Sequence, residues 1–168
     1  LDADEMVQAD RPVPAVLADA QGDVLRLAPF EAMHYRKAAV NGRPAHYFRG
    51  ALPDTPQGRA AGERAYGRFA GTLASGMLSH AAGKHFVRTG LADAELSIHA
   101  PFIGDKRAKA DTAQDARLLH FHGADYDDWR AQLDRRLAGG AYIPKFQKDK
   151  TGPDNLYQTL VTLQRRRG

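Results

Sequence analysis

The segment ARLLHFH at residues 116–122 indicates the fold class, because its last four side chains alternate between apolar and polar as in a strand with two different faces. Gly123-Ala124 then turns the chain, and Asp125 can cap a helix that ends at Gly139-Gly140. Apolar side chains recur in that helix at helical spacing, at Tyr126, Trp129, Leu133 and Leu137. A strand followed by a helix that packs on a sheet predicts an α/β or α+β architecture.

The rest of the chain alternates short strands with helices, without repeats. Residues 55–80 open with a cap at Thr55 and a proline at Pro56, but their many glycines predict a broken, adaptable region. Residues 104–115 are charged and without periodicity, which predicts an exposed or mobile loop. The other expected elements are a helix at 12–20, a strand at 23–27 leading into a turn at Pro29 and Phe30, strands at 85–88 and 95–99, and a helix at 153–166.

Composition is that of one ordinary soluble domain spanning residues 1–168, with 43% hydrophobic and 26% charged residues. The chain has no cysteine, which excludes disulfides, thiolate metal ligands and cysteine nucleophiles, and it has no apolar run of about 18 residues that would span a membrane. The net charge is +4, with much of the surplus after residue 144. We expect this basic tail to be solvated, and therefore expect no nucleic-acid partner. The alternative is that the tail binds nucleic acid or an anionic membrane surface.

The first five residues, Leu1-Asp2-Ala3-Asp4-Glu5, carry the first chemical signal. Alternate residues of an extended strand point the same way, so Asp2 and Asp4 can direct two carboxylates to one place. Such a pair suits a hard divalent ion that also binds substrate phosphates. The alternative interpretation is a solvated turn with a helix N-terminus at Asp4.

The second signal is the pair His120 and His122, which share one face of the strand while Leu119 and Phe121 share the other. An imidazole there can bind a metal, with its tautomer fixed by a neighbouring group. The alternative is two half-exposed polar positions. A binuclear metallohydrolase is less favoured, because Ala124 and Asp125 follow where an Asp-His pair is expected.

Taken in order, these pieces resemble the C-terminal half of glycosyltransferase family 2-like proteins of the GT-A fold, from Leu1 to about Tyr142. The resemblance is carried by the Asp-x-Asp-Glu start, by GKHFVR at 83–88, by SIHAP at 97–101 and by LLHF at 118–121 leading into the aromatic helix. It implies part of a Rossmann-like α/β/α domain, with the N-terminal nucleotide-binding half expected upstream of Leu1. It also implies a cytoplasmic enzyme that could associate peripherally with a membrane only through such missing segments.

The resemblance further implies metal-dependent transfer of a sugar from a nucleotide-diphosphate donor to a saccharide or other hydroxyl acceptor. Asp4 would be the principal ligand of Mn²⁺ or Mg²⁺, Asp2 would lie near the ribose or the metal, and His120 would complete the metal or diphosphate site. Lys84 and Arg88 occupy positions where the family often carries basic residues near the site.

The catalytic base of an inverting transfer is not marked by any motif; Glu63 is the candidate by position. A segment of small residues before His80 would line the acceptor pocket, since glycines let the backbone approach a sugar closely. Two other classes stay open. One is a divalent-metal hydrolase using Asp2, Asp4, His120 and His122, and the other is a non-catalytic basic binding module.

Overall fold

A computed structural model describes residues 1–33, 39–40, 43–44, 47–79, 81–97, 100–122, 127, 129–132 and 135. Its architecture is mixed α/β, built on one sheet whose strands run in the order β1-β10-β2, with β5 and β6 sharing the far edge of β2. The β10–β2 pair is parallel, and the three other pairs of this sheet are antiparallel. The strands of the sheet are β1 (Glu5–Ala9), β2 (Val24–Met33), β5 (Tyr47–Gly50), β6 (Lys84–Val87) and β10 (Asp111–His120).

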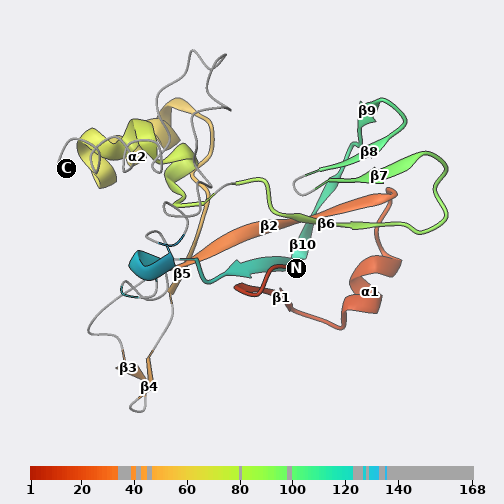
Figure 1. The fold of residues 1–168 in the computed structure, drawn as a ribbon, viewed down its shortest axis with the longest axis horizontal. Helices are drawn as coiled ribbons and strands as arrows, with labels where there is room; N and C mark the ends of the chain where they lie inside the picture. Colours follow the sequence, from red (N-terminus) through yellow and green to blue (C-terminus); the bar gives the residue numbers. More distant parts are fainter. Residues whose placement is uncertain are drawn as a thin grey trace.

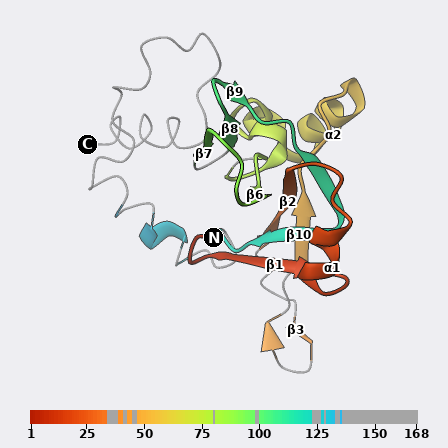
Figure 2. The same cartoon turned by 90° about the vertical axis from the view of Figure 1, so that its right-hand side faces the viewer.

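Two helices lie at opposite ends of this sheet, α1 (Val13–Ala18) and α2 (Pro56–Tyr66) (Figure 1). Two short 3-10 helical segments, Gly67–Thr72 and Ala74–Gly76, follow α2. Seen from the side, β1 and β10 run next to each other, and the chain passes from β1 into α1 (Figure 2). The remaining strands form two small sheets, β3 (Ala39–Val40) with β4 (Arg43–Pro44), and β7 (Ala94–Leu96) with β8 (Pro101–Ile103) and β9 (Lys106–Arg107).

The turn predicted at Pro29 and Phe30 is wrong, because β2 continues through both residues to Met33. β6 pairs with β2 only up to Leu27, and β5 pairs with it only from Phe30 onward. Pro29 therefore falls in the gap between the two neighbours on that edge, where the N–H that proline lacks is not needed for the ladder.

The loop predicted for residues 104–115 is also wrong. This stretch contains β9 and the first half of β10, which begins at Asp111. The first half of β10 is largely exposed, so its polar side chains are compatible with a strand although they show no apolar periodicity. Residues 116–120 of the strand expected at 116–122 thus form the last part of a longer one, whereas Phe121 and His122 follow its end.

The predicted helix at 12–20 is confirmed as α1, and the cap at Thr55 is confirmed at the start of α2. The Thr55 hydroxyl accepts from the Gly58 N–H at 3.1 Å, and Pro56 occupies the first helical turn. α2 runs unbroken for 11 residues in spite of its glycines. At Gly58 a Cβ would lie 2.0 Å from the Pro53 carbonyl oxygen, so glycine is required there for the close approach of the two segments.

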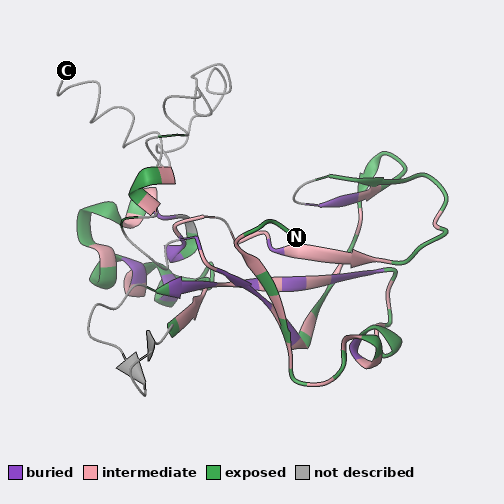
Figure 3. Cartoon of the chain, turned by 60° about the horizontal axis from the view of Figure 1, so that its bottom comes forward, coloured by how far each residue is buried: buried purple, intermediate pink, exposed green. Residues whose placement is uncertain are grey.

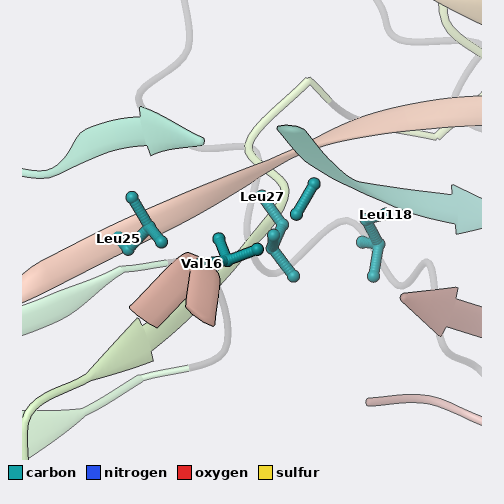
Figure 4. Close-up of a cluster of buried hydrophobic side chains, with 5 residues drawn as sticks. Val16, Leu25, Leu27 and Leu118 are labelled. Atoms are coloured by element: carbon teal, nitrogen blue, oxygen red, sulfur yellow. The ribbon is translucent and has the colours of Figure 1, made fainter. Parts of the chain in front are cut away.

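The apolar core lies on one face of the sheet, beneath α1. Buried positions follow β2 along most of its length (Figure 3). Val16 of α1 packs with Leu25 and Leu27 of β2 and with Ala116 and Leu118 of β10 (Figure 4). Because side chains alternate along a strand, this face also receives the odd-numbered residues of β2 and the even-numbered residues of β10 beyond the core.

Part of the predicted C-terminal structure lies outside the described residues, namely most of the helix expected after Asp125 and all of the helix at 153–166. The described residues 127, 129–132 and 135 are helical, and Arg130 and Arg135 are exposed, as expected for the outer side of that helix. Within the described ranges, every helix is too short or too polar to cross a bilayer.

Candidate metal centre

The register between β1 and β10 brings Asp4 to the two histidines. β1 pairs with β10 so that Glu5 lies opposite His120, and one residue further the Phe121 N–H donates to the Asp4 carbonyl at 2.8 Å. Residues more than a hundred positions apart in the sequence are thereby held side by side. The extended geometry expected for Asp2 and Asp4 is wrong, because residues 2–5 form a turn closed by the Glu5 N–H and the Asp2 carbonyl at 3.1 Å.

Asp4, His120 and His122 form a group whose ligand atoms lie within 4.8 Å of one another. Oδ2 of Asp4 is 3.4 Å from Nε2 of His120 and 3.8 Å from Nδ1 of His122. The two imidazole centroids are 5.2 Å apart, and both histidines are buried. His122, which the sequence assigned only to the hydrolase alternative, therefore joins the two residues expected to bind a metal.

A second layer of polar groups lies behind His120. Its Nδ1 is 3.1 Å from the Ser79 hydroxyl, which also lies 2.7 Å from Oε1 of Glu31. The backbone N–H groups of Leu78 and Ser79 donate to the same carboxylate at 2.8 and 2.6 Å. Sequence reasoning missed both Glu31 and Ser79. One available signal was the charge of Glu31 inside the otherwise apolar run from Leu27 to Met33.

Glu31 is held as an ion although its side chain is only 1% exposed. Burial alone would raise its pKa, but the hydrogen bonds from Ser79 and Leu78 and the charge of Arg49 outweigh that effect and lower the pKa below its ordinary value. Arg49 Nη2 lies 3.3 Å from Oε2 of Glu31, and Nη1 donates to the Tyr66 hydroxyl at the end of α2. The network therefore extends from the histidine to α2.

Asp2 and Lys84 form an ion pair beside the metal group. Lys84 Nζ lies 3.0 Å from Oδ2 of Asp2 and 3.5 Å from Oε2 of Glu5. The hydrogen bond and the charge of Lys84 lower the pKa of Asp2 and outweigh burial, which would raise it. Burial would lower the pKa of Lys84, but Asp2 and Glu5 raise it. The carboxylate of Asp2 is thus engaged by Lys84.

Gly83 determines how Lys84 enters this cluster. Its φ is +75°, and a Cβ there would lie 2.1 Å from the Leu27 carbonyl oxygen. Only glycine permits both this conformation and so close a contact. The position immediately before Lys84 therefore constrains the start of β6.

The other predicted site residues lie elsewhere. Arg88 is at the opposite end of β6, where its Nε donates to Asp23 at 2.8 Å, so the structure does not bring it to the metal group. Glu63 is on α2 and lines a pocket of about 320 Å³ with Arg59 and Gly76, a pocket to which the metal group does not contribute. His80 lies outside the described residues.

The donor set fits a divalent transition metal better than Mg²⁺. Two ligand atoms bound at about 2.1 Å to one ion lie about 3.0–3.4 Å apart at tetrahedral or octahedral angles. The 3.4 Å between Asp4 and His120 is in this range, and 3.8 Å to His122 requires only a small movement. Imidazole nitrogens suit zinc, iron and nickel, and a mixed nitrogen and oxygen set also accommodates manganese, whereas Mg²⁺ prefers oxygen ligands alone.

Comparisons of this chain with protein-family models, with curated proteins and with solved structures give no significant match.

Proposed function

We propose that Asp4, His120 and His122 bind a divalent metal, Mn²⁺ rather than Mg²⁺, and that this site serves a glycosyltransferase acting on a nucleotide-diphosphate sugar. The observation that supports this most directly is the position of Asp4 Oδ2, which lies 3.4 Å from Nε2 of His120. This is longer than a good hydrogen bond and fits two ligands of one ion. The proposal thus joins the Asp-x-Asp-Glu start of the chain to a histidine of β10.

The activity follows from what such a site supplies to sugar transfer. When a nucleotide-diphosphate sugar reacts, negative charge grows on the departing diphosphate, and a bound cation stabilises it. Asp4 and the two histidines would hold that cation at the edge of the sheet. Asp2 would orient the donor's ribose or polar groups near the metal, and Lys84 would add positive charge beside it. The GT-A fold and a hydroxyl-bearing acceptor belong to the same proposal.

Metal binding is tested first, by isothermal titration of the protein with Mn²⁺, Zn²⁺ and Mg²⁺. We expect Mn²⁺ and Zn²⁺ to bind at one site and Mg²⁺ to bind much more weakly. Asp4→Ala should weaken Mn²⁺ binding by more than about 100-fold, since removal of a direct ligand costs more than removal of a supporting group. Asp105→Ala, which removes an exposed carboxylate from the turn between β8 and β9, should leave the affinity unchanged.

Donor binding is tested next with the full-length protein. A panel of nucleotide-diphosphate sugars should bind in the presence of Mn²⁺ and not after chelation, and Asp4→Ala should abolish that binding. Donor binding that ignores the metal, or that survives Asp4→Ala, would contradict the proposed transferase.

A second candidate function is a divalent-metal hydrolase. The participation of His122 favours it, because two imidazoles and a carboxylate are typical of sites that activate a water molecule. Turnover of a phosphate ester without any nucleotide sugar, lost in both Asp4→Ala and His122→Ala, would support the hydrolase over the transferase.

A further inference from the structure

Glu31 lies behind the candidate metal centre rather than in it. Its carboxylate is 1% exposed and receives four hydrogen bonds, from the Leu78 and Ser79 amides, the Ser79 hydroxyl and Arg49. Each carboxylate oxygen therefore accepts two of these bonds. A carboxylate with all these hydrogen bonds is poorly placed to take a proton from a substrate. Its role must therefore lie in the groups that it orients.

The hydrogen bonds around Ser79 have a defined direction. A hydroxyl carries one hydrogen, and an ionised carboxylate can only accept. The Ser79 hydroxyl lies 2.7 Å from Oε1 of Glu31, so its hydrogen is donated there. Toward His120, 3.1 Å away, the same oxygen can only accept, and Nδ1 of His120 must therefore carry the hydrogen of that bond.

This direction determines which nitrogen of His120 faces the metal as a ligand. In a neutral imidazole with hydrogen on Nδ1, the lone pair is on Nε2. Nε2 is the atom that lies 3.4 Å from Oδ2 of Asp4. The hydrogen-bond chain thus places the lone pair on the side of the ring where Asp4 supplies the second ligand.

We infer that Glu31 and Ser79 are positioning residues, which fix His120 as the tautomer whose Nε2 binds the metal. The inference rests on the proposed metal site and adds to it two residues that do not themselves touch the ion. The arrangement corresponds to the partner that a metal-bound histidine usually has at its other nitrogen, here a carboxylate acting through a serine.

Arg49 and Tyr66 extend this arrangement to α2. Arg49 balances the charge of Glu31 and donates to the Tyr66 hydroxyl, and its guanidinium lies over the Tyr66 ring at 5.3 Å from the centroid. The orientation of the carboxylate is therefore determined by β5 and α2 as well as by its own strand.

The test compares Glu31→Gln and Ser79→Ala with the wild type, using isothermal titration with Zn²⁺ and ¹⁵N NMR of the histidine rings at a pH where they are neutral. The side-chain amide of Gln at position 31 can donate a hydrogen bond to the Ser79 hydroxyl. The Ser79 hydroxyl can then donate its own hydrogen to Nδ1 of His120, and the hydrogen of the neutral His120 ring moves to Nε2. We expect Zn²⁺ to bind about 10- to 100-fold more weakly to Glu31→Gln. The metal-free His120 should show Nδ1–H in the wild type and Nε2–H in this variant.

Ser79→Ala keeps the Leu78 and Ser79 amides and Arg49 on Glu31, so it tests the inference if Glu31→Gln does not fold. It should give a mixture of the two His120 tautomers and a similar weakening of Zn²⁺ binding. Ser97→Ala is the matched control, because it also removes a partly buried hydroxyl, one bonded to the Ala100 carbonyl at 2.6 Å in the β7–β8 connection. Glu95→Gln, at an exposed position of β7, is the matched control for Glu31→Gln.

The outcomes separate this inference from the proposed metal site. Unchanged ring nitrogen signals in folded Glu31→Gln or Ser79→Ala would overturn the positioning role, even if the wild type binds Zn²⁺ tightly. A wild type that binds no metal but shows the expected tautomer change would overturn the metal site while supporting the hydrogen-bond chain.

Discussion

The two ends of one sheet face have opposite characters although the same strands form both. Under α1, the inward side chains are apolar: Leu25 and Leu27 of β2 lie against Leu118 of β10. A few residues further along the same strands, the inward positions are Glu31 and His120, which are paired in the β10–β2 register. A single face thus changes from core to site without a change of secondary structure.

The two ends differ in the interactions that stabilise their buried side chains. The apolar end needs only close packing, which α1 supplies through Val16. The polar end needs a partner for every buried charge, and residues 78–79 with Arg49 supply these for Glu31. The apolar end is therefore sensitive to lost volume, and the polar end to lost charge or hydrogen bonds.

The largest effect on stability is expected from Glu31→Ala. It leaves Arg49 and two amides without the carboxylate, and breaking a buried ion pair in this way costs about 3–5 kcal/mol of the free energy of unfolding. Urea unfolding measures the loss, with exposed Glu95→Ala as control. A loss within about 0.5 kcal/mol of the control would remove the distinction between the two ends.

Leu27→Ala should cost somewhat less, about 3 kcal/mol, because it removes a buried side chain from the apolar end and leaves a cavity. The matched control is Leu96→Ala, since Leu96 is 71% exposed, and its change should stay within about 0.5 kcal/mol. Unlike Glu31→Gln, Leu27→Ala should leave the affinity for Zn²⁺ unaltered. A loss of metal binding in the folded variant would show that the two ends are not independent.

Acid should weaken the polar end before the apolar one. The pKa of Glu31 is lower in the folded chain than its ordinary value of 4.5, so the stability that it contributes is fully present above that value and is lost as the pH falls through it toward the folded pKa. Urea midpoints recorded from neutral pH down to about 3 should fall in the wild type. They should fall less steeply in Glu31→Gln, and equal slopes would contradict the assignment of this loss to Glu31.

The smallest effect is expected from Thr55→Ala, which removes the cap of α2 and should cost about 1 kcal/mol. α2 supports the polar end through Tyr66 and Arg49, so hydrogen exchange should rise in α2 while the amides of α1 keep their protection. Exposed Thr89→Ala serves as the control. Equal increases in both helices would mean that the two ends open together.

Local patterns in the sequence predicted part of this structure. α1, the Thr55 cap and the strands around His85 and His120 follow from composition, caps and alternation. The path of β2 through Pro29 could not be predicted, because it depends on where two other strands stop pairing. For the site, the sequence indicated Asp4, His120 and His122 as candidate ligands, but their proximity follows from the register of β1 on β10. The link between Glu31 and Ser79 arises from a long-range contact with no local signature.

The pairing of β1 with β10 has a kinetic consequence. A site made from residue 4 and residues 120–122 forms only when the first strand has docked on the last strand of the sheet, and contacts of such sequence separation are slow to close. A metal that binds only the completed site stabilises the folded chain by mass action. It should act on the rate of unfolding far more than on the rate of folding, since its ligands are brought together late. The ion would then slow the unfolding of the completed sheet and would not nucleate its folding.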